Sequence, residues 1–176
     1  MPDVRTRETY LFDTITHSDP VAAGTSFSYF TNTGTKTTNQ QNFQNERKVR
    51  DGAEMRVWRI GVKYEATVTI ADAALLDENI VLTFLVDGIE QTQGPVSMFP
   101  AGGGVHYVAP AATATLFQIN NGAPGNHAAA DRTTPIIVTG MNDYEVVLRH
   151  GAASDMSADV DVQVILYVHM REPVRA

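Results

Sequence analysis

Cysteine is absent from this chain, lysine is scarce, and no long apolar run occurs anywhere in it. Without cysteine, disulfides and thiolate metal sites are excluded, which fits a protein made in a reducing cytoplasm. No apolar stretch reaches the roughly 18 residues of a membrane-spanning helix, so we expect no such helix. The first residues, MPDVRTRETYLF, lack the apolar segment of a secretory signal peptide. The N-x-S/T acceptor pattern is also missing, as in an unglycosylated bacterial product.

The charge balance argues against one broad class of function. The 176 residues carry a formal net charge of −7, and the sequence pI is about 5.1. A dedicated nucleic-acid-binding protein usually presents a strongly basic face, so we expect no sequence-specific nucleic-acid partner. With 43% hydrophobic and 19% charged residues, the composition is that of a globular protein. The length predicts a single domain spanning residues 1–176.

Hydrophobic alternation with a period of two predicts long β-strands. In SADVDVQVILYVHM, every second residue from Val160 to Met170 is apolar, so this segment is expected to bury one face. Residues 54–70 predict a second long strand, with Trp58 on its apolar face and therefore buried. The segment ADAALLDE, residues 71–78, is the one stretch that reads as helical. We expect Asp72 to cap this helix, and Leu75 and Leu76 to anchor it to the sheet.

Residues 79–93 predict a β-hairpin that turns at Asp87-Gly88, because both positions of this dipeptide tolerate positive φ. The remaining strand candidates, separated by glycine and proline, are residues 7–16, 25–31, 104–109, 113–119, 134–139 and 143–149. About eight to ten short strands with one short helix predict an all-β fold, an antiparallel sandwich or barrel. Two polar segments, 31–52 and 120–133, are long enough to be loops that are either mobile or used for contacts.

The triple glycine Gly102–Gly104 is interpreted as an architectural feature rather than a phosphate-binding loop. A phosphate loop needs a following lysine and a helix, whereas here a strand-like run containing His106 follows. The glycines are therefore expected to give backbone freedom at a turn or bulge.

The side chains that could carry chemistry form no recognised motif, so we expect no catalytic, cofactor-binding or metal-binding residues. None of the histidines has the spacing of a helical zinc site; they are His17, His106, His127, His150 and His169. No nucleophile elbow surrounds any of the candidate serines, Ser26, Ser28, Ser97, Ser154 and Ser157. A weak cation site at Asp155, Asp159 and Asp161 is left open, although a solvated face explains these acids better.

Positive charge gathers in one place, the segment ERKVR at residues 46–50, together with Arg56, Arg59 and Lys63. This patch could bind a phosphate or an anionic membrane surface. Pairing of these cations with acids on the same sheet or on a neighbouring subunit is the preferred interpretation.

Three segments together resemble the small capsid proteins of tailless icosahedral bacteriophages. They are LFDTITHSDPVAAGTSFSYFTNTGTKTTNQQNF near the start, the VWRIGVKYEA strand and GPVSMFPAGGGV in mid-chain. The resemblance implies a single jelly roll of about eight strands in two sheets. It also implies a structural virion protein, not an enzyme, that is synthesised in the host bacterial cytoplasm and assembled into the capsid shell.

The implied partners are copies of the same chain and a second capsid protein, close to an internal viral membrane but without insertion into it. Three alternatives remain open: a phage head decoration protein, a carbohydrate-binding sandwich of the tail-spike or lectin kind, and an enzyme of the cupin or dioxygenase type. The single tryptophan, Trp58, argues against the carbohydrate-binding module if it is buried, because sugars stack on exposed aromatic rings.

Overall fold

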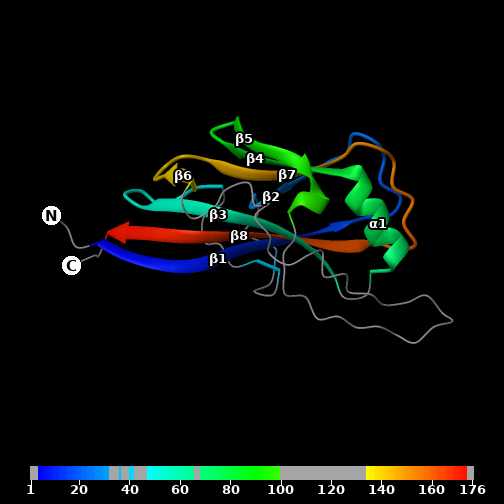
Figure 1. Ribbon diagram of the computed structural model, residues 1–176, viewed down its shortest axis with the longest axis horizontal. Helices are drawn as coiled ribbons and strands as arrows, with labels where there is room; N and C mark the ends of the chain where they lie inside the picture. Colours follow the sequence, from blue (N-terminus) through cyan, green and yellow to red (C-terminus); the bar gives the residue numbers. More distant parts are fainter. Residues whose placement is uncertain are drawn as a thin grey trace.

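In the part of the chain that the computed structural model describes, eight strands and one α-helix make up the architecture (Figure 1). The structure describes residues 4–31, 36, 40–41, 47–65, 68–99 and 134–173. In chain order, the elements are β1 (Val4–His17), β2 (Ser26–Tyr29), β3 (Glu54–Tyr64), α1 (Ile70–Asn79), β4 (Ile80–Val86), β5 (Ile89–Pro95), the short 3-10 helix η1 (Val96–Met98), β6 (Ile136–Thr139), β7 (Tyr144–His150) and β8 (Val160–Pro173). No helix among these residues is long and apolar enough to cross a membrane.

The strand pairing is that of a jelly roll. The first strand pairs with the last, β2 with β7, β3 with β6 and β4 with β5, always antiparallel. Pairing of β8 with β3 and of β7 with β4 completes two four-stranded sheets, ordered β1-β8-β3-β6 and β2-β7-β4-β5. A chain that folds back on itself in nested antiparallel pairs and then rolls into two sheets has this order. The predicted all-β antiparallel sandwich of about eight strands with one short helix is therefore confirmed.

The central strand β8 shows why the sequence folds this way. All of its alternate residues from Val160 to Met170 are buried, and their neighbours are only half-buried. A fully buried valine or leucine contributes roughly 1.5–3 kcal/mol, and a slip of one residue would turn the whole row outward. The inner face of β8 meets Leu82 and Phe84 of β4 and Leu148 of β7 in one hydrophobic core.

The prediction for β3 is wrong in two respects. The strand ends at Tyr64, short of Ile70, which begins the helix. A β-bulge between Val57 and Arg59 also adds one residue to β3 opposite β8, so the alternation changes phase there. Met55 and Val57 face the core before the bulge and Ile60 faces it afterwards, while Trp58 is half-buried beside Tyr167 on the outer face.

The helix is confirmed, but its cap is not the predicted residue. Thr69 is the N-cap, and its hydroxyl accepts a hydrogen bond from the amide of Asp72 at 3.1 Å. Asp72 lies three residues further on, and its carboxylate accepts a hydrogen bond from the Thr69 hydroxyl at 2.7 Å, a reciprocal pair like a capping box. As predicted, Leu76 is fully buried and Leu75 packs against the core.

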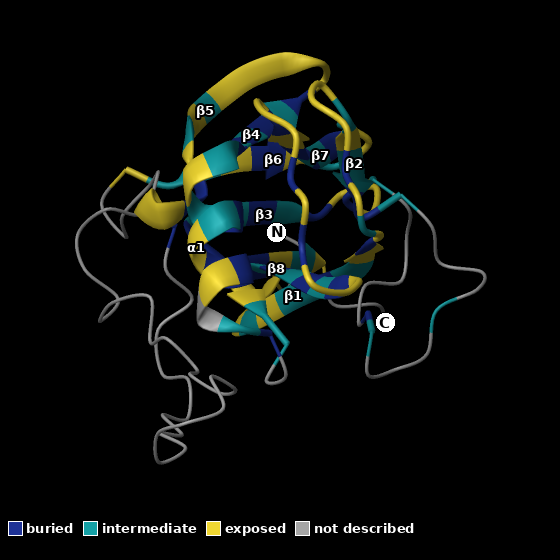
Figure 2. Cartoon of the chain, turned by 90° about the vertical axis from the view of Figure 1, so that its right-hand side faces the viewer, coloured by how far each residue is buried: buried dark blue, intermediate teal, exposed yellow. Residues whose placement is uncertain are grey.

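The β4–β5 hairpin turns at Asp87-Gly88, as predicted. Asp87 has φ 51° and Gly88 has φ 75°, the left-handed backbone that this kind of turn requires. β5 lies at the edge of its sheet and carries mostly exposed residues (Figure 2). The predicted strands 104–109 and 113–119, the glycines Gly102–Gly104 and the predicted loop 120–133 lie outside the described residues.

Candidate functional site

Two of the five histidines come together inside the sandwich. His17 is the last residue of β1 and His150 is the last residue of β7, and neither is exposed to solvent. β1 and β7 belong to different sheets, so this contact joins the two layers at one end of the fold. His169 lies instead on the outer face of β8, 3.7 Å from a carboxylate oxygen of Glu8. His106 and His127 lie outside the described residues.

The register of β1 explains why polar side chains point inward. Asp13 pairs with Val164 and His17 with Val160, and residues paired across an antiparallel ladder share one face of the sheet. Because Val160 and Val164 face the core, Asp13 and His17 face it too. The inward row of β1 therefore ends in a histidine that needs hydrogen-bond partners, and β2 and β7 supply them.

Hydrogen bonds form a continuous chain through this cluster. Nδ1 of His17 lies 3.0 Å from Nε2 of His150, and Nε2 of His17 lies 3.0 Å from the hydroxyl of Tyr29. That hydroxyl donates to the carbonyl oxygen of Val162 at 3.2 Å. At the other end, Nδ1 of His150 lies 3.0 Å from Oγ of Ser154, which also accepts a hydrogen bond from Asn79 at 3.3 Å.

The surroundings keep both imidazoles neutral. Burial is the main cause, and the neighbouring His150 the lesser one, of a pKa of His17 that is lowered to about 3. Burial also lowers the pKa of His150. The ring of Phe27 stacks on His17 with 3.7 Å between ring centroids, which places an apolar surface against the ring. For Tyr29, burial raises the pKa, and the carboxylates of Asp13 and Asp161 raise it further, so the phenol remains a hydrogen-bond donor.

This cluster combines a serine, two histidines and a tyrosine, but its geometry is that of an internal support. Ser154 is only 1% exposed and the histidines not at all, so no substrate reaches the hydroxyl in this conformation. Both nitrogens of each ring already have a partner, leaving no lone pair for a metal ion. Across the described part of the chain, no three His, Asp or Glu side chains are arranged to hold a metal ion.

The three acids considered as a weak cation site do not converge. Asp159 accepts a hydrogen bond from the backbone of Asp19 at 2.8 Å, and Asp161 accepts one from the hydroxyl of Thr16 at 2.5 Å. Asp155 is exposed in the loop before β8. Asp159 and Asp161 therefore each fix a different neighbouring segment, and neither is directed toward a shared cation site.

The cations of the basic segment pair with acids on the same molecule where the structure describes such contacts. Arg47 lies 3.1 Å from Glu145, and Lys48 lies 3.5 Å from Asp143. Arg56 pairs with Glu54 of the same strand. The guanidinium of Arg59 lies 4.9 Å from the centre of the Tyr167 ring, a cation–π contact.

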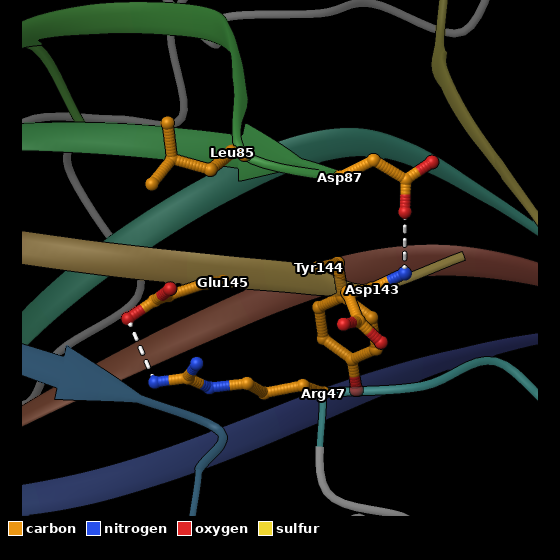
Figure 3. Close-up of a pocket in the computed structure, with 7 residues that line it drawn as sticks. Arg47, Leu85, Asp87, Asp143, Tyr144 and Glu145 are labelled. Atoms are coloured by element: carbon orange, nitrogen blue, oxygen red, sulfur yellow. Dashed lines mark hydrogen bonds and ion pairs between the residues drawn. The ribbon is translucent and has the colours of Figure 1, made fainter. Parts of the chain in front are cut away.

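One open pocket, of about 380 Å³, lies where the β4–β5 turn meets the start of β7 (Figure 3). Its lining residues are Arg47, Leu85, Asp87, Gly88, Asp143, Tyr144 and Glu145. The carboxylate of Asp87 accepts hydrogen bonds from the Asp143 amide at 2.8 Å and from Asn142 at 2.6 Å. Each charged side chain of the pocket already has a partner, since Arg47 pairs with Glu145 and the Asp143 carboxylate with Lys48. The pocket is therefore better described as a joint between two turns than as a ligand site.

Sequence reasoning missed most of the buried cluster. It named His17, His150 and Ser154 as candidates but could not bring them together, and it did not consider Tyr29 or Asp13. One signal was available: Asp13 and His17 fall on the same alternate positions of β1 as Leu11 and Ile15. A polar residue in an inward row predicts an internal hydrogen-bond partner, although it does not say which one.

The described residues thus define a jelly-roll sandwich with a polar cluster buried between its sheets. No protein-family model, curated protein or solved structure gives a significant match to the chain.

Proposed function

We propose that this chain is a structural virion protein, a capsid subunit that assembles with copies of itself into the shell of a bacteriophage. The observation that supports it most is a jelly roll in which carboxylates fix described loops at both ends of the sandwich, so that these loops present exposed surfaces in a defined conformation. Rigid surfaces suit repeated association, because little loop entropy is lost when subunits bind.

At one end, a single side chain fixes two turns. Asp87 in the β4–β5 turn binds both Asn142 and the Asp143 amide in the β6–β7 turn. The backbone amide of Asp87 also donates to the carbonyl of Asp143 at 2.8 Å. Met141 donates its amide to the carbonyl of Val49, so a third segment is held against the same turns.

At the opposite end, the β7–β8 loop is fixed to the helix and to the β1–β2 loop. Asp72 accepts a hydrogen bond from the backbone of Ser157 at 2.9 Å and another from the Ser157 hydroxyl. Asp19 accepts one from the amide of Met156 at 2.7 Å. The β1–β2 and β7–β8 loops are therefore held in place against the sandwich and the helix.

Exposed apolar side chains next to the first set of fixed turns supply a candidate contact surface. Ile89 at the start of β5 is 66% exposed, and Met141 in the β6–β7 turn is 61% exposed. The two turns lie at the same end of the sandwich (Figure 1). Apolar residues presented on rigid turns favour association with another protein surface, and the proposal assigns that surface to a second copy.

The proposed setting is the virion, with synthesis in the cytoplasm of the bacterial host. A second capsid protein is a further proposed partner, and the shell stands close to an internal membrane without entering it. A head decoration protein would use the same rigid surfaces on a preformed shell, and differs in failing to assemble alone.

The proposal is tested by electron microscopy of the concentrated protein with matched variants. Rings, sheets or shells are expected for the wild-type chain. Ile89→Asp combined with Met141→Asp should abolish them, because two charges would be buried in the contact. Met98→Asp, which adds a charge at another exposed methionine, serves as the control and should leave assembly intact. Dispersed single molecules of the wild-type chain in all conditions would count against a capsid subunit.

A second candidate, a carbohydrate-binding module, gains support from the position of Trp58. This ring is half-buried on the outer face of the β1-β8-β3-β6 sheet, 5.5 Å from the Tyr167 ring and 6.2 Å from the His169 ring, rather than in the core. Aromatic side chains on an outer face can stack against sugars. Glycan-array binding that is lost in Trp58→Ala would favour this function over a capsid subunit.

A further inference from the structure

The hydrogen-bond chain through the histidine pair has a fixed direction, because both of its ends are chemically unambiguous. The carbonyl of Val162 can only accept, so the Tyr29 hydroxyl donates to it. The oxygen of Tyr29 therefore accepts from Nε2–H of His17. At the other end, the amide nitrogen of Asn79 can only donate, and it donates to Oγ of Ser154.

This direction assigns a tautomer to each ring. A neutral His17 that carries its proton on Nε2 has a free lone pair on Nδ1, which must accept from Nε2–H of His150. His150 is then also protonated on Nε2, and its Nδ1 accepts from the Ser154 hydroxyl. Every donor in the chain has one acceptor, and the arrangement holds only while both rings are neutral.

Protonation of one imidazole ring forces the hydrogen bonds of this arrangement to change, and protonation of both rings is incompatible with it. A proton on Nδ1 of His17 would face the N–H of His150 across 3.0 Å, so His150 would have to shift its own proton to Nδ1 and Ser154 would have to turn its hydroxyl. Two protonated rings would set two N–H groups and two positive charges against each other in a buried site.

No carboxylate of the described residues lies within ion-pair distance of either ring. The acids on neighbouring elements are engaged elsewhere: Asp13 with Lys36, Asp19 with Met156, Asp161 with Thr16, Asp159 with Asp19, Asp72 with Ser157 and Asp77 with Tyr64. Arg149, next to His150, and Glu78 near the end of α1 are exposed to solvent. The groups in contact with His17 are themselves uncharged: the Tyr29 hydroxyl, the Phe27 ring and the neutral His150. An imidazolium here would therefore have no counter-ion among the residues that the structure describes.

Ser154 connects the pair to both loops at this end of the sandwich. Its backbone exchanges two hydrogen bonds of 2.9 Å with Val21 in the β1–β2 loop. The carbonyl of His150 accepts a further hydrogen bond from Gly24 of the same loop at 2.7 Å. Reorientation of His150 and Ser154 would thus loosen the contact between the β1–β2 and β7–β8 loops before the sheets separate.

We propose that the His17–His150 contact is an acid-operated latch, which holds the β1–β2 and β7–β8 loops together at neutral pH and releases them when the rings are protonated. The inference does not depend on the proposed function, since it rests on the buried contact alone.

The direction of the pH dependence follows from the pKa values. Burial holds the pKa of His17 at about 3 in the closed state, against 6.5 for a free histidine, and the pKa of His150 is lowered as well. The open state therefore binds more protons below pH 6.5, so the latch is fully stable above that value and weakens as the pH falls toward 3. From the titration of His17 alone, the equilibrium constant for opening of the latch increases by about 25-fold as the pH falls from 7 to 5.

Hydrogen exchange on the wild-type chain tests the latch directly. After correction for intrinsic exchange rates, protection of the Val21, Gly24 and Ser154 amides should fall at least about tenfold from pH 7 to pH 5, while Leu166 in β8 keeps its protection. In His17→Gln, whose amide cannot be protonated in this range, the pH dependence should be much weaker. His169→Gln, which removes a histidine from the outer face, is the control and should behave as wild type.

Nitrogen-15 NMR of the imidazoles keeps the test decisive if His17→Gln fails to fold. Both rings of the wild-type chain should be neutral Nε2–H tautomers at pH 7, and those of the closed state should remain neutral at pH 5. The proposal is overturned if either ring titrates near pH 6.5 with its loops still protected. Loop protection that does not change between pH 7 and pH 5 would overturn it equally.

Discussion

Asp13 shows how strongly a single buried carboxylate can hold this fold together. Its side chain is fully buried, accepts a hydrogen bond from the Phe30 amide at 2.7 Å and lies 2.5 Å from Nζ of Lys36. Phe30 has φ 65°, an uncommon backbone for a phenylalanine, and this hydrogen bond helps to hold it there. The carboxylate thus ties Phe30, directly after β2, and Lys36 to β1.

Asp13→Ala is expected to lower the free energy of unfolding by about 3–5 kcal/mol, because it leaves a poorly hydrated ammonium group and a backbone amide without their acceptor. Urea unfolding at neutral pH measures the change. Lys48→Ala removes the Lys48–Asp143 pair, in which both side chains are about half exposed, and should cost less than about 1 kcal/mol. Similar costs for the two variants would contradict the role given to Asp13.

Two glycines at the same end of the molecule should respond differently to alanine. A Cβ at Gly140 would lie 2.8 Å from Arg50 O and from Gly52 N, both backbone atoms that cannot move aside alone. A Cβ added at Gly88 would have no atom within 4 Å beyond its chain neighbours, so alanine there is disfavoured only by the φ of 75°. We expect Gly140→Ala to lower the free energy of unfolding by about 3 kcal/mol and Gly88→Ala to lower it by roughly 1–2 kcal/mol. Thermal unfolding measures both changes. The reverse order would contradict the close approach at Gly140.

Sequence patterns locate residues on a face more readily than they pair them. The row Leu11, Asp13, Ile15 and His17 can be read from the sequence, and so can the turn at Asp87. The partner of His17 cannot be read from the sequence, because His150 is 133 residues away and contacts it from the other sheet. Such pairings depend on the roll of the whole chain, which no local pattern contains.

At the scale of elements, the helix is defined by its first turn. Thr69 and Asp72 exchange hydrogen bonds at the N-terminus, and Asp72 also binds Ser157 of the β7–β8 loop. Burial alone would raise the pKa of Asp72, but the hydrogen bonds from Ser157 and Thr69 lower it below 3.8 overall. Its contribution to stability is therefore present above pH 3.8 and is lost as the pH falls below it, in a more acidic window than that in which the histidine pair begins to titrate.

Thr69→Ala should lower the free energy of unfolding by about 1 kcal/mol through loss of the helix cap. Thr69→Ser keeps the hydroxyl and should stay within a few tenths of a kcal/mol of wild type. Chemical unfolding followed by circular dichroism compares the two. Equal destabilisation by alanine and serine would show that the methyl group of Thr69, rather than its hydroxyl, stabilises the helix.

Strands with an unbroken period of two were the easiest elements to predict. β8 keeps its alternation through Met170, and the structure follows it residue by residue. In β3 the bulge beside Trp58 changes the phase, and a bulge inserts a residue without altering the local composition that marks a strand. The prediction that Trp58 lies on the buried face was therefore wrong. The argument against a carbohydrate-binding module that rested on its burial no longer holds.

At the scale of the whole molecule, the nested pairing from β1·β8 to β4·β5 produces two sheets and brings the described turns to the two ends of the sandwich. Periodicity alone predicted a sandwich or a barrel, and the resemblance to phage capsid proteins pointed to the jelly roll. The order of the strands could not be read from the chain, since it depends on contacts between residues far apart in sequence.

Self-association is the claim on which the capsid proposal depends, and sedimentation velocity at increasing protein concentration and several salt concentrations measures it most directly. The account predicts that the 19.2 kDa chain moves into discrete, much larger species as its concentration rises. A single species with the mass of one chain under every condition would contradict it.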